Sequence, residues 1–243
     1  MVDDINPDNP NPINPDGTQD PFEVKENSEQ DSEDSLDDAP EVFYPDEPRN
    51  KIKVGDEVNL TQKDPTLREI TIGVGWDLKA FESDPLDLDA SVFLLDRNDK
   101  TRIDEDFVFY HNLRDLDGAV IHKGDSRTGA GDGDDETITI DLTKLSFEVL
   151  KIAFVVSIYD MEFKGHDFSM VKNVYFRIVN QNTDSELFRF ELDDELTEHD
   201  GLLIGMLERV GAEWVFNAIG ETIEGGLGKI ASDYGCVIVE NMA

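Results

Sequence analysis

The chain has 243 residues, and its 56 Asp and Glu against 21 Lys and Arg give a formal net charge of -35. Nucleic-acid binding needs clustered Lys and Arg to neutralise phosphates, so this charge argues against a nucleic-acid partner. It also argues against direct contact with an anionic membrane, and leaves only indirect contact bridged by a divalent cation. The single cysteine, Cys236, rules out an internal disulfide and a cysteine-based metal site, and the 4 histidines show no paired spacing of a zinc site.

Residues 1–50 form an acidic tail that we expect to be disordered. An Asn-Pro tract between Asn6 and Pro15 precedes sequence rich in Asp, Glu and Ser, and 16 acidic against 2 basic side chains give the tail a net charge of -14. Its few apolar residues cannot offset the entropy cost of ordering the backbone. The N-terminus lacks the pattern of a signal peptide, and no segment has the roughly 18–20 apolar residues of a transmembrane segment. We therefore expect a soluble, intracellular protein.

From Lys51 the pattern changes to that of one globular domain, residues 51–243. Alternation of apolar and polar residues predicts strands at Glu69 to Trp76, Ala90 to Leu95, Phe107 to Tyr110, Thr137 to Leu142, Val174 to Val179, Glu186 to Leu192 and Glu213 to Ile219. Ile152 to Tyr159 is almost continuously apolar, which predicts a central strand buried on both faces. Helices are predicted at Leu202 to Val210 and at Gly226 to Tyr234, the second ended by Gly235. The prediction is a mainly β fold, a β-sandwich of two packed sheets with a few short helices.

The densest group of carboxylates lies between Gly124 and Glu136. This segment holds 5 carboxylates and 4 glycines in 13 residues and leads directly into a predicted strand. The carboxylates repel one another, and glycine adds backbone freedom that folding must remove, so the segment is a poor choice for a simple connector. Ca²⁺ takes about six to eight oxygen ligands in a flexible geometry, which suits such a loop. The composition therefore favours a Ca²⁺ site over the alternative of a solvated acidic loop.

Further oxygen donors stand near predicted strand ends. Asp87 and Asp89 are two residues apart and project from one face of an extended segment, while Asn112 lies in a turn. Asp77 and Asp160 follow predicted strands, and such positions can gather at one edge of a sandwich. The predicted ligands, enough for two ions, are Asp77, Asp87, Asp89, Asn112, Asp125, Asp132, Asp134, Asp135, Glu136 and Asp160.

Several short motifs occur along the chain in the same order as in a known protein family. They are Gly73-Val74-Gly75-Trp76-Asp77, Asp87-Leu88-Asp89-Ala90-Ser91, Phe107-Val108-Phe109-Tyr110-His111-Asn112, Gly124 to Glu136, Ile158-Tyr159-Asp160 and Glu213-Trp214-Val215-Phe216. Over about residues 51–235 the chain resembles the TerD family of tellurium-resistance and general stress proteins. The resemblance implies a cytoplasmic β-sandwich that binds Ca²⁺ through acidic loops and has no accepted enzymatic activity. His111 and Ser126 stand where the family usually has Asn.

Two other interpretations stay open. A metal-dependent hydrolase would hold Mg²⁺ or Mn²⁺ with these acidic residues and act on a phosphorylated substrate. The chain lacks a phosphate-binding Gly-x-x-x-x-Gly-Lys-Ser/Thr loop and a nucleophile motif, and few basic residues lie near the acidic clusters. The ion could also be purely structural. We expect a non-enzymatic stress-response module in which Ca²⁺ orders acidic loops that engage partner proteins.

Overall fold

The computed structural model describes residues 50–79, 86, 88–124, 133–158, 166–192 and 196–236. All of these belong to one unit, residues 46–243. Residues 1–49 of the predicted tail lie outside the described residues. So do four of the predicted ligands, namely Asp87, Asp125, Asp132 and Asp160.

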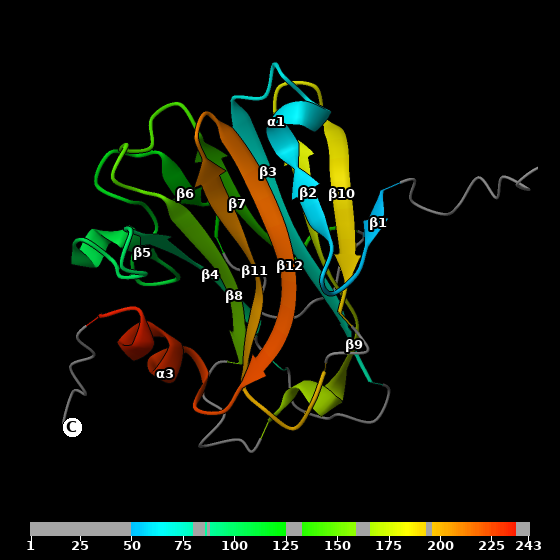
Figure 1. Ribbon diagram of the computed structural model, residues 1–243. Coiled ribbons are helices and arrows are strands. Elements are labelled where there is room, and N and C mark those ends of the chain that lie inside the picture. The colour runs from blue at the N-terminus through cyan, green and yellow to red at the C-terminus, as the bar shows by residue number, and fades with distance from the viewer. Residues whose placement is uncertain are drawn as a thin grey trace, which may run out of the picture. The chain divides into compact units, whose positions relative to one another are not determined.

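The described strands form two six-stranded sheets that pack face to face (Figure 1). The first sheet has the order β1 (Lys51–Ile52), β10 (Ser185–Glu191), β9 (Val171–Asn180), β3 (Glu69–Leu78), β7 (Glu136–Asp141), β6 (Val120–His122). The second has the order β2 (Glu57–Asn59), β12 (Glu213–Ile223), β11 (Gly201–Val210), β8 (Lys151–Ile158), β4 (Leu88–Leu95), β5 (Phe107–Val108). Neighbouring strands are antiparallel except β1 and β10, which are parallel. The predicted β-sandwich is confirmed.

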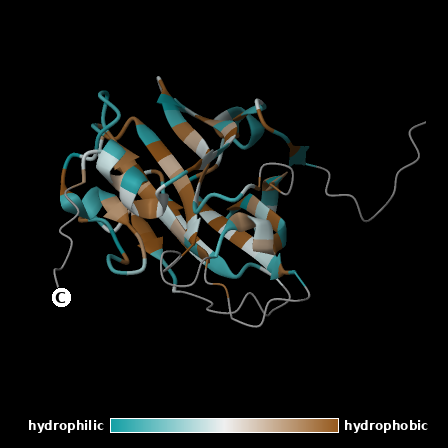
Figure 2. Ribbon diagram, turned by 90° about the horizontal axis from the view of Figure 1, so that it is seen from below, coloured by the Kyte–Doolittle hydropathy of each residue, from teal (hydrophilic) through white to brown (hydrophobic). Residues whose placement is uncertain are grey.

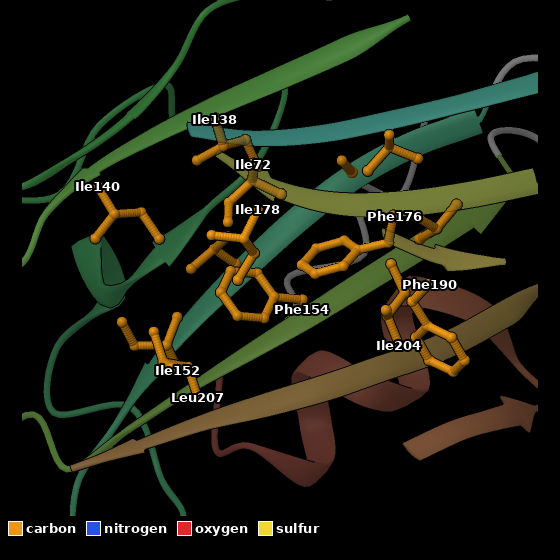
Figure 3. Packing of buried hydrophobic residues seen from close by; sticks show 14 of the residues in the cluster. Ile72, Ile138, Ile140, Ile152, Phe154, Phe176, Ile178, Phe190, Ile204 and Leu207 are labelled. Carbon is orange, nitrogen blue, oxygen red and sulfur yellow. The ribbon is translucent and has the colours of Figure 1, made fainter. Parts of the chain in front are cut away.

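The core lies between the two sheets and is built by the inward-facing residues, which alternate with outward-facing ones along the strands. Burial along β7 alternates at every residue, as expected for a strand with one face on the core. Figure 2 shows the same alternation as bands of hydrophobic and hydrophilic colour along the strands. In Figure 3, Ile72 and Ile178 of the first sheet face Phe154 and Leu207 of the second. Burying each such side chain contributes about 1.5–3 kcal/mol, so this contact holds the sheets together.

A second apolar cluster lies on the outer face of the second sheet, under helix α3 (Gly226–Asp233). Ile230 and Ala231 of the helix pack against Phe93, Val155 and Leu203. The strands beneath are therefore buried on both faces, which explains the continuous apolar run of β8 and confirms the prediction of a central strand. The predicted helix near the C-terminus is confirmed as α3, and Gly235 follows it with a left-handed φ of 92°.

The predicted helix at Leu202 to Val210 is wrong, because these residues belong to β11. The strand pairs with β8 on one side and β12 on the other. Its first five residues are all buried, since the sheet core covers one face and α3 the other. A short run that is apolar at every position has no period to distinguish strand from helix, and long-range pairing decides the outcome.

Several short elements were not predicted from the sequence. They are β1, β2, β6, helix α1 (Leu60–Lys63) and the 3-10 turns η1 (Asp104–Asp106) and η2 (Phe168–Met170). The strand predicted to reach Tyr110 ends at Val108, because Phe109 and Asn112 exchange two backbone hydrogen bonds of 3.0 and 2.9 Å and close a turn. No helix in the described part of the chain is long and apolar enough to cross a membrane.

Candidate metal centre

Five of the predicted ligands gather at one end of the sandwich, which we call the acidic end: Asp77, Asp89, Asp134, Asp135 and Glu136. Antiparallel pairing of β3 with β7 places the end of β3 beside the start of β7, with Val74 opposite Glu136. In the second sheet the start of β4 lies beside the end of β8, with Leu88 opposite Ile158. The side chain of Glu136 bonds to the backbone of Ala90 on β4, so both sheets meet at this end.

Glu136 and His122 contact the backbone N–H and C=O of Ala90 on the edge of β4 that β5 leaves unpaired. Glu136 is 1% exposed, and its Oε2 accepts a hydrogen bond from the backbone N–H of Ala90. His122 is also buried and places Nε2 3.2 Å from the carbonyl oxygen of Ala90 and 3.6 Å from Glu136 Oε2. Neighbour β5 pairs with β4 only at Val92 and Phe93, so these side chains satisfy the backbone groups that β5 does not reach.

The charge of the acidic end acts on His122. Burial lowers the pKa of the imidazole, but the hydrogen bond and charge of Glu136, the Ala90 carbonyl and the charge of Asp89 outweigh it, and the pKa is raised from its ordinary value. The backbone N–H of Gly124 donates to Nδ1 at 3.2 Å, which opposes protonation of that nitrogen. We place the proton on Nε2, toward Ala90 and Glu136.

Asp134 is bound to an arginine. Its carboxylate accepts from Arg177 Nε at 2.7 Å and Nη2 at 2.9 Å, and from the hydroxyl of Tyr175 at 3.0 Å. The hydrogen bond with Asp134 raises the pKa of Arg177, while burial, with the charge of Asp134, raises the pKa of Tyr175 to about 12. A methyl group on Gly73 would lie 2.2 Å from this carboxylate, so glycine makes room for it.

Asp135 and Asp77 form the half-exposed part of the acidic end. Asp135 Oδ2 accepts from the backbone N–H of Trp76 at 2.9 Å. Burial raises the pKa of Asp135, the Trp76 hydrogen bond lowers it, and the charges of Asp77 and Asp134 raise it further, with a net increase. Exposed Asp77 accepts a hydrogen bond of 2.6 Å from Asn173 Nδ2. These carboxylates are close enough to repel one another.

Asp89 and Asn112 have different surroundings. Asp89 is 3% exposed and lies opposite Ser157, on the face of β4 that points away from the first sheet. Asn112 uses its amide Nδ2 to donate to Phe107 O at 2.7 Å, which holds its own turn. Among the described residues, no contact joins Asn112 to the other predicted ligands, and no group of three His, Cys, Asp or Glu is arranged to hold a metal ion.

Two residues important to this geometry, His122 and Arg177, were missed in the sequence. His122 occupies the buried face of a three-residue strand beside Val120, too short for its alternation to be recognised. Arg177 lies directly opposite Gly73 on β3, and this pairing is known only once the sheet order is known.

A TerD domain matches residues 49–234, most of the chain and all of its described strands. The chain belongs to the TerD family. It is 41% identical over 182 residues to general stress protein 16U of Bacillus subtilis (strain 168), covering 74% of this chain and 94% of that protein. It is also 41% identical over 181 residues to tellurium resistance protein TerD of Serratia marcescens, covering 74% and 94%.

Solved structures support the TerD fold. The crystal structure of a homologue of telluride resistance protein (TerD) from Streptomyces coelicolor A3(2) matches with a TM-score of 0.58. It is 18% identical and covers 70% of this chain and 99% of that chain, so the likeness concerns the fold alone. Residues 1–48 lie outside the TerD match.

Proposed function

We propose that this TerD-family protein is a non-enzymatic stress-response module that binds Ca²⁺ at the acidic end. The observation that carries the proposal is the burial of carboxylates there. Asp89 and Glu136 are 3% and 1% exposed, and Asp135 has a pKa raised by burial and by neighbouring carboxylates. Removing carboxylates from water is costly unless positive charge compensates, and a divalent cation supplies that charge.

The donor atoms suit Ca²⁺. Every predicted ligand at the acidic end is a carboxylate, and oxygen ligands favour Ca²⁺ over softer metals. The glycine-rich sequence from Gly124 to Glu136 suits the flexible geometry of Ca²⁺ better than the near-ideal octahedral geometry that Mg²⁺ requires. Asp77, Asp89, Asp135 and Glu136 would provide ligands together with Asp87, Asp125, Asp132 and Asp160, a set large enough for two ions, because no three of the described carboxylates are arranged around one ion. Asp134 is engaged by Arg177 and Asn112 by its own turn, so we assign both a supporting role. When bound, Ca²⁺ supplies charge neutralisation and orders the acidic end.

The biological setting follows from the relatives. Proteins 41% identical to this chain carry the names general stress protein and tellurium resistance protein, which supports a role in the stress response and in tellurium resistance. We propose that the protein acts in the cytoplasm and that its ion-ordered acidic end binds other proteins of a stress-response complex. The net charge of -35 favours partners with basic surfaces and makes membrane contact indirect.

Calorimetry on chelator-stripped protein tests the ion assignment. We expect binding of Ca²⁺ in preference to Mg²⁺, and a rise in melting temperature with Ca²⁺, because an ion in thousandfold excess over its Kd stabilises the native state by about 4 kcal/mol. Asp89→Asn should weaken Ca²⁺ binding. Glu57→Gln, which removes an exposed carboxylate from β2, should leave it unchanged.

Tight Mg²⁺ binding without Ca²⁺ binding would overturn the proposal and would support the hydrolase interpretation. Equal Ca²⁺ affinity in the wild type and Asp89→Asn would remove Asp89 from the ligands.

A further inference from the structure

At the start of β7, two side chains that are two residues apart lie on opposite faces of the first sheet. Residues i and i+2 of a regular strand share one face of the sheet. Here Glu136 points between the sheets and bonds to Ala90 on β4, whereas Asp134 binds Arg177 on the outer face of the first sheet. The outward direction of Arg177 follows from its neighbours Phe176 and Ile178, which are both buried in the core. The backbone between Asp134 and Glu136 is therefore not in regular strand conformation and must be held by specific contacts.

The strongest of these contacts is the paired hydrogen bond between Asp134 and Arg177. Two parallel N–H···O bonds of 2.7 and 2.9 Å fix both the distance and the orientation of the carboxylate. Tyr175 adds a third bond of 3.0 Å from the same strand, β9. Next to this contact, the backbone N–H of Asp135 donates to Val74 O at 2.8 Å, and the Asp135 carboxylate accepts a hydrogen bond from the backbone N–H of Trp76.

Arg177 is itself held in place from the opposite side. Its Nη1 lies 3.2 Å from Glu186 Oε2 on β10, and Arg189 approaches the same carboxylate at 3.7 Å. The Arg189 guanidinium also stacks 3.8 Å from the centre of the Tyr175 ring. The guanidinium of Arg177 is thus oriented by β10 before Asp134 binds it, so little side-chain entropy is lost when the contact forms.

We propose that Arg177 is a positioning residue of the ion site, which anchors Asp134 on the outer face of the first sheet and thereby directs Asp135 and Glu136 toward the ion. The inference rests on the proposed Ca²⁺ function. It assigns Asp134 to the anchor and not to the ligands, although Asp134 stands among the densest carboxylates of the sequence.

The anchor and ligand roles of Asp134 predict opposite effects of removing Arg177. If Asp134 is a ligand, Arg177 competes with the ion, and Arg177→Gln strengthens Ca²⁺ binding or leaves it unchanged. Loss of a nearby positive charge acts in the same direction. If Asp134 is the anchor, Arg177→Gln weakens binding despite the loss of positive charge, because Asp135 and Glu136 are no longer held in place.

Calorimetric Ca²⁺ titrations of wild type, Arg177→Gln, Asp134→Asn and the double variant distinguish these roles. We expect each single variant to weaken binding by about 10- to 100-fold, the usual effect of residues that orient metal ligands, and the double variant to weaken it no further. Lys51→Gln is the control. It removes one positive charge from the first sheet, at the position opposite Arg189 in register, where Lys51 pairs with the exposed Glu191 at 2.8 Å, and it should bind Ca²⁺ like the wild type.

A second measurement needs no ion. In chelator, the backbone amide NMR signals of Trp76 and Asp135 should shift in Arg177→Gln and Asp134→Asn, but not in Lys51→Gln. Should Arg177→Gln fold poorly, Arg177→Lys keeps the charge, loses the paired hydrogen bond and should still weaken Ca²⁺ binding. Wild-type Ca²⁺ affinity in both Arg177 variants, or unshifted amides in both, overturns the anchor. Absence of Ca²⁺ binding by the wild type overturns the ion site itself.

Discussion

Three consecutive acidic residues that look equivalent in the sequence have three different environments. Asp134 binds Arg177, Asp135 accepts from the Trp76 backbone, and Glu136 is buried against Ala90 and His122. In the sequence this cluster is the densest group of carboxylates and is predicted to bind an ion as a unit. The sequence could not assign the separate roles, because each depends on a partner at least 14 residues away in the chain, on a strand whose neighbours only the sheet order defines.

At this scale we predict that Gly73→Ala destabilises the protein. The new methyl group would lie 2.2 Å from the Asp134 carboxylate, which two hydrogen bonds to Arg177 hold in place. Such crowding costs about 1–3 kcal/mol, and each kcal/mol lowers the melting temperature of a domain of this size by about 2–4 °C. Differential scanning calorimetry in chelator measures the effect. Thr71→Ala, two residues earlier on β3, should change the melting temperature less, and an equal fall in both variants would contradict the crowding argument.

Among the elements, strands with one buried face were predicted well, whereas of the strands covered on both faces β8 was predicted and β11 was not. β3 and β7 were found within two residues at each end, because alternation marks them directly. β11 was assigned to a helix because α3 covers its outer face and removes the polar half of the pattern. β1, β2 and β6 have two or three residues, too few for a period to be detected.

Because α3 and the residues after it pack on the second apolar cluster, we predict that Cys236 reacts slowly with alkylating reagents. Cys236 packs against the second apolar cluster, and its Sγ lies 3.6 Å from Thr101 Oγ1. Burial raises the pKa of the thiol above its ordinary value of 9.0, although the Thr101 contact lowers it in part. The reactive thiolate therefore forms at higher pH than in a free cysteine. We expect the rate of iodoacetamide alkylation to reach half its maximum above pH 9.0 in native protein, and near the free-cysteine value in denaturant. Equal pH profiles in both states would show that α3 leaves the thiol accessible.

On the scale of the whole molecule, the acidic tail and the TerD domain should be energetically separate. The tail carries a net charge of -14 and the domain is also acidic, so electrostatic repulsion opposes binding of the tail to the domain. The described chain begins at Asn50, which is already part of the fold. Its carbonyl accepts from Arg189 N–H at 3.0 Å, and its Nδ2 donates to Glu186 O at 3.1 Å.

Two truncations test this separation. Removal of residues 1–45 should leave the melting temperature and the number of bound Ca²⁺ ions unchanged at physiological salt. Removal of residues 1–50 should lower the melting temperature, because the Asn50 hydrogen bonds to β10 are lost and each contributes about 0.5–1.5 kcal/mol. A fall of several degrees in the shorter truncation would show that the tail packs on the domain.

The short outermost strands have a consequence for behaviour at high protein concentration. In the described part of the chain, both sheets end in strands of only two or three residues, β1 and β6 in one and β2 and β5 in the other. A long unpaired edge offers its N–H and C=O groups to any second molecule and starts edge-to-edge aggregation, whereas a short edge gives a foreign strand little to pair with. Glu136 and His122 extend this protection, since they occupy the backbone groups of Ala90 where β5 stops. The same side chains that shape the acidic end thus also limit intermolecular β-pairing at this edge, which should keep the protein monomeric in concentrated solution.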